Sequence, residues 1–571
     1  MDVPNRGRSL RIPIAIGAVV VLGAAGVVTV RAVSGGGSCS GGVRLTVAAA
    51  PEIAPAVRDA AARFTAKGPE VRGNCIRVEV RAAESADVAA LLAARNGGTV
   101  IPGASAGPSP ADADVPTVWI PDSTAWLTRV RAVNREAFEA QVTSVAASPV
   151  VLAATEKVAA GLGGHAIGAE QVNTLLSKVA ARQLQVGAVD PRRSTAGLAG
   201  AGLLYDSIAA DPKRLVDMVR VYRSIALSEN PPALLRAAAT GAQAVLTSEQ
   251  QVLSLSSPTA TSRKSDFSSD PAIDGDLSGL VTMPLDPSMT LDYPYAVVSG
   301  KPASNLAAAE LLRSALTAAR DPFTRLGFRG PDGSTGAAFP TGHGVSQAEA
   351  LVKPLSDAEK ITEVLGYWNA TTAPSRVLTL MDVTSSMTRP IAKGGPSRLD
   401  VLRKAATDGL GLFTDDSELG LWAYAAGLPG GKDYQQIVPV SALTKGQRAR
   451  LTSAVAAAKA APTDTCGLYE TVLAAYRSLK EGYKDGRSNT VVVFTDGANS
   501  KPGMSLETLQ LELERATDPT RPVRVVLLGI GPDVNKQELD TIAATTGGRA
   551  FVVQDPEQIG NIFLQALIRS S

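Results

Sequence analysis

The chain alternates short apolar runs with longer stretches in which apolar residues recur every three or four positions. Residues 43–47 alternate as a strand, and residues 51–67 carry the helical spacing. A strand at 76–80, a helix at 85–95 and a strand at 117–120 continue this order. Strands that alternate with helices predict an α/β fold built on a mostly parallel sheet.

The alternation continues to the end of the chain and divides it into two units. Strands at 148–153 and 184–189 precede a long Ala- and Leu-rich helix that opens at 190–197. A helix at 357–368 lies in a linker, 346–373, that separates the two units. The strands of the second unit are expected at 377–381, 419–424, 490–494, 523–530 and 550–553.

The N-terminus carries a long apolar run. Residues 12–30 are nineteen residues without a charge, enough for a helix of roughly 28 Å. Arginines precede the run, so the positive-inside rule predicts a transmembrane signal-anchor with residues 1–11 in the cytoplasm. A cleavable signal peptide ending at 32–34 is the alternative. The remainder, after a Gly/Ser-rich linker at 31–42, is expected outside the cell membrane, held by a single span.

Composition removes several classes of function. The 56 Lys and Arg residues nearly balance the 54 Asp and Glu residues, and the resulting charge of +2 argues against nucleic acid as a partner. Two His residues exclude a His-rich metal site and argue against a Ser-His-Asp hydrolase. There is no phosphate-binding loop of the G-x-x-x-x-G-K-[ST] type. We therefore expect a protein that is not an enzyme.

The chain has three cysteines. Export permits disulfides, and Cys39 and Cys75, which flank the first strand and helix, are the expected pair. Cys466 is then the odd thiol, and we interpret it as a small, half-buried apolar residue rather than a reactive one.

Several segments of the first unit follow one another in a set order: 43–67, AASPVVLA at 146–153, VGAVDPRRSTAGLAGAGLLY at 186–205, GAQAVLTSEQ at 241–250, LDYPYAVV at 291–298 and FTRLGFRGPDG at 323–333. In this order they resemble segments of periplasmic-type solute-binding proteins of the two-lobed α/β class. The resemblance covers 43–345. It implies two lobes with a ligand cleft between them, lined by the loop and helix at 186–205.

Ser194 and Thr195 are the candidate ligand-binding residues of that cleft. They lie at the start of a helix, where free N–H groups and hydroxyls favour a small polar or anionic solute. The alternative is that they only cap the helix. The fold could also be retained for contacts with proteins.

Oxygen-bearing side chains follow two strands of the second unit. Asp382, Thr384 and Ser386 alternate directly after the strand at 377–381, and Asp496 follows the strand at 490–494. Ligand sites of open α/β sheets lie at the carboxyl ends of strands. Carboxylates and hydroxyls at one such edge suit Mg²⁺, which prefers oxygen ligands.

This pattern resembles the von Willebrand factor A domain with its metal-ion-dependent adhesion site. The family motif is D-x-S-x-S, then a loop Thr, then an Asp after an apolar strand, and the resemblance covers 374–571. It implies a doubly wound, Rossmann-like domain that binds Mg²⁺ or Mn²⁺. Thr465 is the implied loop ligand, although Cys466 interrupts the loop and Thr463 remains a rival. The alternative is a domain that keeps the fold and has lost the metal.

In this family the aspartate that matches Asp496 acts through water, and an acidic residue of a partner fills the open metal position. The sequence therefore predicts an extracytoplasmic, membrane-anchored binding or adhesion protein whose partner is a protein that supplies an acidic residue. The alternative function is a solute receptor or sensor that uses the cleft of the first unit. We also expect Asp382 and its neighbours to lie at the surface.

Overall fold

The structure is a computed structural model. It describes residues 41–102, 107–164, 166–210, 215–241, 243–256, 277–372, 374–411, 413–497, 499–518 and 521–553. Within these ranges, none of the helices combines the length and apolar character that a membrane span requires. The predicted signal-anchor, 12–30, lies outside the described residues, as does Cys39.

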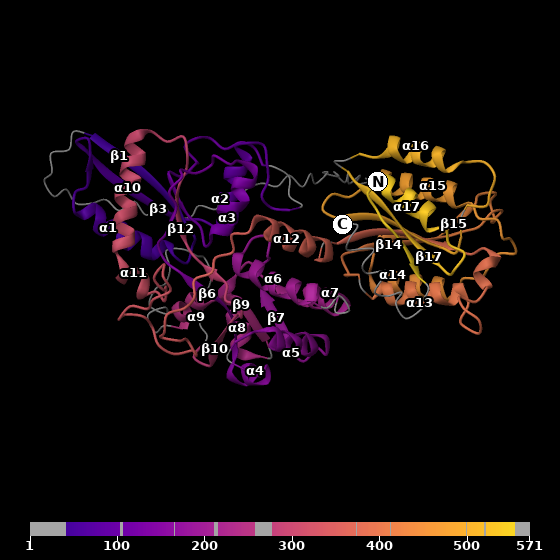
Figure 1. The fold of residues 1–571 in the computed structure, drawn as a ribbon, viewed down its shortest axis with the longest axis horizontal. Coiled ribbons are helices and arrows are strands. Elements are labelled where there is room, and N and C mark those ends of the chain that lie inside the picture. Colours follow the sequence, from indigo (N-terminus) through magenta and orange to yellow (C-terminus); the bar gives the residue numbers. More distant parts are fainter. Residues whose placement is uncertain are drawn as a thin grey trace, which may run out of the picture.

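The described residues form two α/β units that lie end to end and together contain three six-stranded sheets (Figure 1). The first unit holds two sheets and the second unit holds one. The mixed α/β fold predicted from the alternation of strands and helices is therefore confirmed.

The first sheet has two parallel pairings at its centre, β1 with β3 and β1 with β4, while β12 joins it antiparallel to β4. In order across the sheet, the strands are β2 (Glu70–Val71), β3 (Asn74–Ala82), β1 (Gly41–Ala49), β4 (Val118–Ile120), β12 (Pro294–Val297) and β5 (Thr143–Ser144). Its helices are α1 (Ala54–Ala66), α2 (Ser85–Ala94), α3 (Thr124–Val133), α10 (Ala303–Ala318) and α11 (Arg320–Thr324).

The second sheet forms the other lobe of the first unit. Its strands are β10 (Leu280–Pro284), β6 (Ser148–Thr155), β9 (Gln243–Ser248), β7 (Gln185–Ala188) and β8 (Ala226–Leu227), with β11 (Thr290–Leu291) paired to β6. Its helices are α4 (Glu156–Gly161), α5 (Ala169–Ala180), α6 (Thr195–Ala210), α7 (Leu215–Ser224), α8 (Pro231–Thr240) and α9 (Glu249–Ser256). The chain enters this lobe after β5 and returns to the first sheet at β12, so the unit has two lobes.

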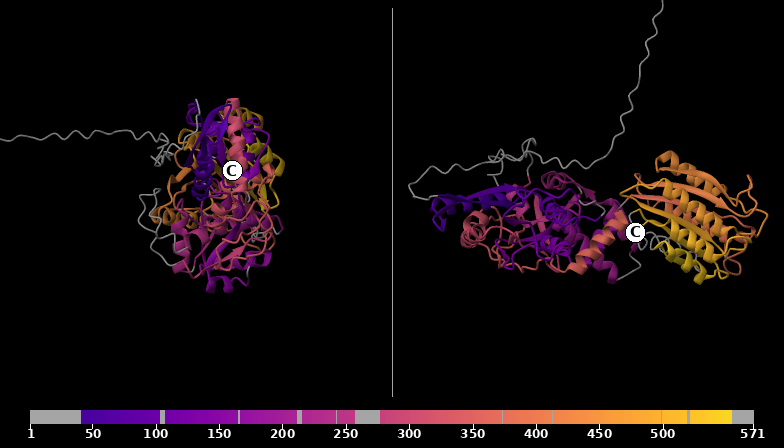
Figure 2. Two further views of the ribbon diagram at one scale, coloured as in Figure 1. Left: turned by 90° about the vertical axis from the view of Figure 1, so that its left-hand side faces the viewer. Right: turned by 90° about the horizontal axis from the view of Figure 1, so that it is seen from above.

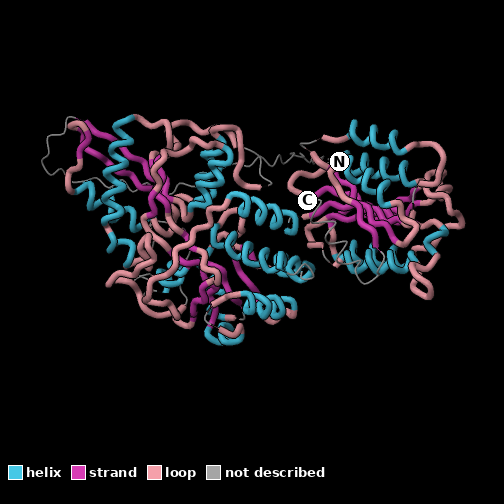
Figure 3. Tube along the Cα trace, viewed as in Figure 1, coloured by secondary structure: helices cyan, strands magenta, loops and turns pink. Residues whose placement is uncertain are grey.

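The third sheet belongs to the second unit and is parallel except for its edge strand β15. The strand order is β15 (Tyr434–Ala442), β14 (Glu418–Tyr424), β13 (Ser375–Asp382), β16 (Ser488–Thr495), β17 (Val523–Ile530) and β18 (Ala550–Val553). Helices cover both faces, as Figure 3 shows. They are α13 (Arg398–Leu410) and α14 (Lys445–Ala457) on one face, and α15 (Leu468–Glu481), α16 (Leu506–Ala516) and α17 (Lys536–Thr545) on the other.

Helix α12 (Ala358–Thr372) connects the units, and the right-hand view in Figure 2 shows the second unit lying beyond it. It packs on α6 and α7 of the second lobe and also contacts α3 of the first lobe. The Arg223 guanidinium donates to the Thr371 carbonyl at 2.7 Å, which fixes the end of α12 against α7. Only residues 373 and 374 separate α12 from β13.

Candidate metal centre

Two carboxylates meet at one edge of the third sheet. Asp382 is the last residue of β13, and Asp496 directly follows β16. These strands are parallel neighbours in a register that places Met381 opposite Phe494, so both aspartates leave the sheet at its carboxyl edge. The apolar runs before them are buried in the sheet, and this burial fixes where each strand ends.

Asp382 is fully buried and accepts hydrogen bonds with both carboxylate oxygens. Its Oδ1 accepts from the Thr384 amide at 2.9 Å and from the Thr384 hydroxyl at 2.7 Å. Its Oδ2 accepts from the Thr495 hydroxyl at 3.2 Å and lies 3.8 Å from the Cys466 sulfur. Burial, and then the charge of Asp496, raise the pKa of Asp382 to about 6.

Two hydroxyls join this carboxylate to the second one. Thr384 Oγ1 lies 2.9 Å from Ser386 Oγ, and Ser386 Oγ donates to Asp496 Oδ1 at 3.0 Å. Ser386 stands in a short 3₁₀ turn, Ser385–Thr388, that bends the chain back over the sheet edge. Four of the five residues predicted as metal ligands are thus brought into one hydrogen-bonded chain.

The fifth predicted residue, Thr465, lies on the loop before α15. The Thr463 hydroxyl accepts from the Thr465 amide at 3.1 Å, and the Thr463 carbonyl accepts from the Ser385 amide at 2.8 Å. Thr463 is therefore used in holding the loop to the 3₁₀ turn. The half-buried Thr465 side chain has no hydrogen bond to any residue that the structure describes.

Cys466 lies beside Asp382 and is a free, buried thiol. Burial raises the pKa of this thiol, and the charge of Asp382 adds to the effect. Cys75 is disulfide-bonded, and its expected partner Cys39 lies outside the described residues.

Our expectation that these ligands lie at the surface is wrong for three of them. Asp382 is 0% exposed, and Thr384 and Asp496 are also buried. The reason is that the 3₁₀ turn and the loop before α15 close over the strand ends. Only Ser386 and Thr465 are half-buried.

An arginine that the sequence did not single out completes the site. The Arg398 guanidinium, at the start of α13, donates from Nη1 to Asp496 Oδ2 at 2.9 Å. Its Nη2 donates to the carboxylate of Asp533, in the turn after β17. No local sequence signal marks this contact, because Arg398 follows an ordinary helix cap, Ser397.

The donor set fits a hard divalent cation. It consists of two carboxylates and three hydroxyls, all of them oxygen ligands of the kind that Mg²⁺ and Mn²⁺ prefer. Among the described residues there is no group of three or more His, Cys, Asp or Glu side chains arranged for a metal. Any metal held here therefore depends on the hydroxyls of Thr384, Ser386 and Thr465 as well as on the aspartates.

The candidate residues of the first unit are already engaged. The Ser194 hydroxyl accepts from the Gly197 amide at 3.2 Å, which is a helix cap. The Thr195 hydroxyl donates to Asp122 Oδ1 at 3.0 Å, a contact that joins the second lobe to the first.

Two carboxyl groups, Asp122 and Glu52, lie near Thr195 at the lobe boundary. Burial raises the pKa of Asp122 to about 6. Burial, and then the charge of Asp122, raise the pKa of Glu52 to about 8, and the Tyr293 hydroxyl donates to Glu52 at 3.0 Å. A raised pKa means that a carboxyl group keeps its proton to a higher pH than an exposed one, so Glu52 is largely uncharged near neutral pH.

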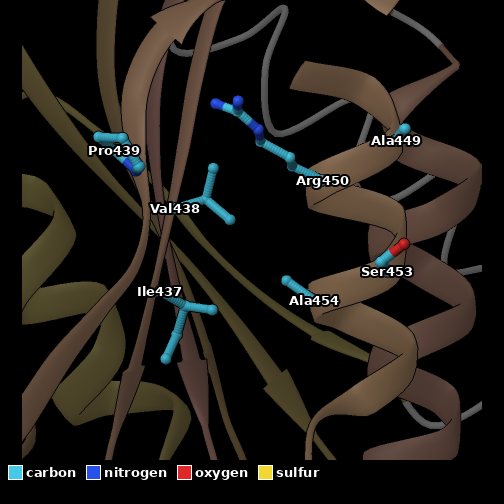
Figure 4. A pocket seen from close by; sticks show the side chains of 7 residues that line it. All are labelled: Ile437, Val438, Pro439, Ala449, Arg450, Ser453 and Ala454. Carbon is cyan, nitrogen blue, oxygen red and sulfur yellow. The ribbon is translucent and has the colours of Figure 1, made fainter. Parts of the chain in front are cut away.

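A shallow groove of about 460 Å³ opens on the second unit between β15 and α14. Figure 4 shows the Arg450 side chain reaching across it toward the strand. The lining residues are Ile437, Val438, Pro439, Ala449, Arg450, Ser453 and Ala454, and none of them belongs to the predicted metal site.

Comparison with solved structures and known proteins gives distant matches. An uncharacterized protein of Mycobacterium tuberculosis is 24% identical over 591 aligned positions, which cover 95% of this chain and 80% of the relative. A von Willebrand factor type A protein from Catenulispora acidiphila has a TM-score of 0.29 at 18% identity, over 35% of this chain and 43% of that one. A Trichodesmium protein in complex with iron and citrate ligands has a TM-score of 0.35 at 12% identity, over 58% of this chain and 97% of that one.

Two family models match the chain in succession. Residues 45–329 match the bacterial extracellular solute-binding proteins, and residues 377–565 match the von Willebrand factor type A domain. The two matches fall on the two units of the structure, with α12 between them. The chain therefore carries a bacterial extracellular solute-binding domain followed by a C-terminal von Willebrand factor type A domain.

Proposed function

We propose that this protein is an extracytoplasmic adhesion protein that captures an acidic residue of a protein partner through a metal ion. The two domains support a binding or adhesion role, and both types of domain are typically non-catalytic. The metal is Mg²⁺ or Mn²⁺ in this proposal. Its ligands are Asp382, Thr384, Ser386, Thr465 and Asp496.

One observation carries the proposal: the hydrogen-bonded chain from Asp382 through Thr384 and Ser386 to Asp496. Every link in it joins two oxygen atoms at 2.7–3.0 Å, and the two ends are carboxylates. Buried carboxylates are costly without a cation or a full set of donors, so a chain of this kind is suited to receive a cation. A bound metal would supply positive charge and an open position for a carboxylate from the partner.

The proposed ligands have different roles in binding the metal. The Thr495 hydroxyl donates to Asp382 Oδ2, so the position of this carboxylate is fixed before a metal binds. Thr384 and Ser386 can rotate their hydroxyl protons away and offer lone pairs. Thr465 remains the preferred loop ligand over Thr463, because the Thr463 hydroxyl already accepts a backbone amide.

The location of the protein forms the second part of the proposal. The solute-binding domain suggests an extracytoplasmic protein, because its family consists of extracellular proteins. We further propose that residues 12–30 anchor the chain in the cell membrane as a single span, with both domains outside.

The solute receptor or sensor has less support. Both of its candidate residues already have hydrogen-bond partners, Ser194 in a helix cap and Thr195 with Asp122.

Metal binding is tested by thermal unfolding of the purified chain, stripped with a chelator and then titrated with Mg²⁺ or Mn²⁺. A ligand of the native state at a hundred times its Kd adds about 2.7 kcal/mol, so we expect one transition to rise by several degrees. The Asp382→Asn variant should lose this shift while keeping a folded domain, since Asn retains the shape and one acceptor. A wild-type chain without a shift at millimolar metal would refute the proposal.

A further inference from the structure

A buried arginine stands between two carboxylates at the metal site. The Arg398 side chain is 4% exposed and binds Asp496 on one side, while Asp533 on its other side is 61% exposed. The same guanidinium thus contacts a proposed metal ligand and a carboxylate at the protein surface.

The guanidinium is held firmly in place. Ser397 caps α13, and the Arg398 amide donates to the Arg389 carbonyl at 2.9 Å, which closes the intervening loop. Gly531 lies against the guanidinium, and a Cβ at this position would come within 3.0 Å of Arg398 Nε. Its φ of +102° is a second reason for glycine here.

Asp496 divides its two oxygens between different partners. Its Oδ1 accepts from Ser386, and its Oδ2 accepts from Arg398. A cation that meets Asp496 on the Ser386 side therefore has a fixed positive charge just across that carboxylate. Arg398 cannot lose this charge at physiological pH.

We infer that Arg398 and Asp533 form a pair that sets the metal affinity of the site, Arg398 lowering it and Asp533 partly restoring it. The inference rests on the proposed function, since it concerns the same metal. It differs from a purely structural role, in which both residues would support metal binding by holding Asp496.

Coulomb's law gives the size of the two effects. At separations of about 6 Å, a unit charge changes the binding constant of a divalent cation by about tenfold even at the dielectric constant of water. Arg398 is buried, so its repulsion is at least of this order. Asp533 is more distant and exposed, so solvent and salt reduce its attraction to about two- to fivefold.

The test compares variants that break the same ion pair from opposite sides. Removing the positive charge with Arg398→Gln should tighten Mg²⁺ binding by about tenfold or more. Removing the negative charge with Asp533→Asn should weaken binding by about two- to fivefold, and the loss should shrink at high salt. Arg398→Lys keeps the charge and should bind metal like the wild type.

The measurement is calorimetric titration of the full chain with Mg²⁺ alone, together with thermal unfolding of the metal-free form. Arg398→Gln should lower the metal-free melting temperature, because Asp496 loses its buried partner, and should enlarge the shift that metal produces. Arg477→Gln is a matched control, because Arg477 of α15 forms an ion pair with Glu512 of α16 at the surface. Its metal affinity should equal that of the wild type.

The signs decide the outcome. Weaker binding in both Arg398→Gln and Asp533→Asn would mean that the pair only positions Asp496, and equal binding in all variants would mean that it has no influence. If Arg398→Gln fails to fold, the salt dependence of Asp533→Asn decides. A loss of affinity that shrinks at high salt supports the inference, whereas a loss that salt leaves unchanged, or unchanged or tighter binding, contradicts it. A wild type that binds no metal would instead refute the proposed function itself.

Discussion

Cys466 illustrates how the proposed metal site is shielded at the scale of single residues. Its side chain is 6% exposed, and the amides of Ser500 and Lys501 donate to its backbone carbonyl at 3.1 Å, which closes the loop over it. We therefore predict that a maleimide reagent labels the native chain slowly and the urea-unfolded chain rapidly. Mass spectrometry of the labelled peptide measures both rates, and fast labelling of the native chain would contradict the burial of this loop.

Single residues also show which part of the site can be predicted from sequence. Asp382 and Asp496 could be predicted, because each follows an apolar strand and parallel strands end at a common edge. Arg398 could not, because its contact to Asp496 joins residues 98 positions apart, and the contact to Asp533 joins residues 135 positions apart. Neither pairing leaves a local pattern. Burial of Asp382 was missed for the same reason, since distant loops produce it.

At the scale of elements, strands covered on both faces were the easiest to predict. The apolar runs of β13, β16 and β17 are buried almost throughout, and their sequences are correspondingly apolar. The edge strand β15 is mostly exposed, and Pro439 interrupts its short apolar run at 437–440, so the sequence did not indicate a strand there. Short strands such as β2, with two residues, are defined only by their pairing.

Glu52 and Asp122, which follow β1 and β4 of the first sheet, make the stability of the solute-binding domain depend on pH. The pKa of Glu52 is raised from 4.5 to about 8 and that of Asp122 from 3.8 to about 6. Over this pH range the folded state therefore binds more protons than the unfolded state does. Stability of the solute-binding domain should therefore fall as pH rises from about 4 to 8. We predict a melting temperature that drops by several degrees over this range, and a flatter profile in Glu52→Gln. Calorimetry at successive pH values measures it, and a rising profile would contradict the prediction.

At the scale of the whole molecule, α12 determines how the two domains are joined. It packs against α6, α7 and α3 of the solute-binding domain, where the ring centroids of Trp368 and Tyr222 lie 5.0 Å apart. Tyr367 contacts Tyr205 of α6 in the same way at 5.3 Å. Because residues 373 and 374 alone lead from α12 to β13, the von Willebrand domain begins almost at the surface of its neighbour. The helix predicted as a linker is thus structurally part of the first domain.

This assignment predicts that damage to α12 affects one domain and spares the other. Trp368 is 1% exposed, and replacing a buried Trp by Ala costs about 3–5 kcal/mol. In Trp368→Ala the transition of the solute-binding domain should move to lower temperature by roughly 10 °C, given about 2–4 °C per kcal/mol. The second domain should keep its melting temperature and its response to Mg²⁺, because the metal site lies at the far ends of β13 and β16 from the helix. Calorimetry with and without metal separates the two transitions. If both transitions fall together, or the metal response is lost, the domains unfold as one cooperative body and α12 transmits stability between them.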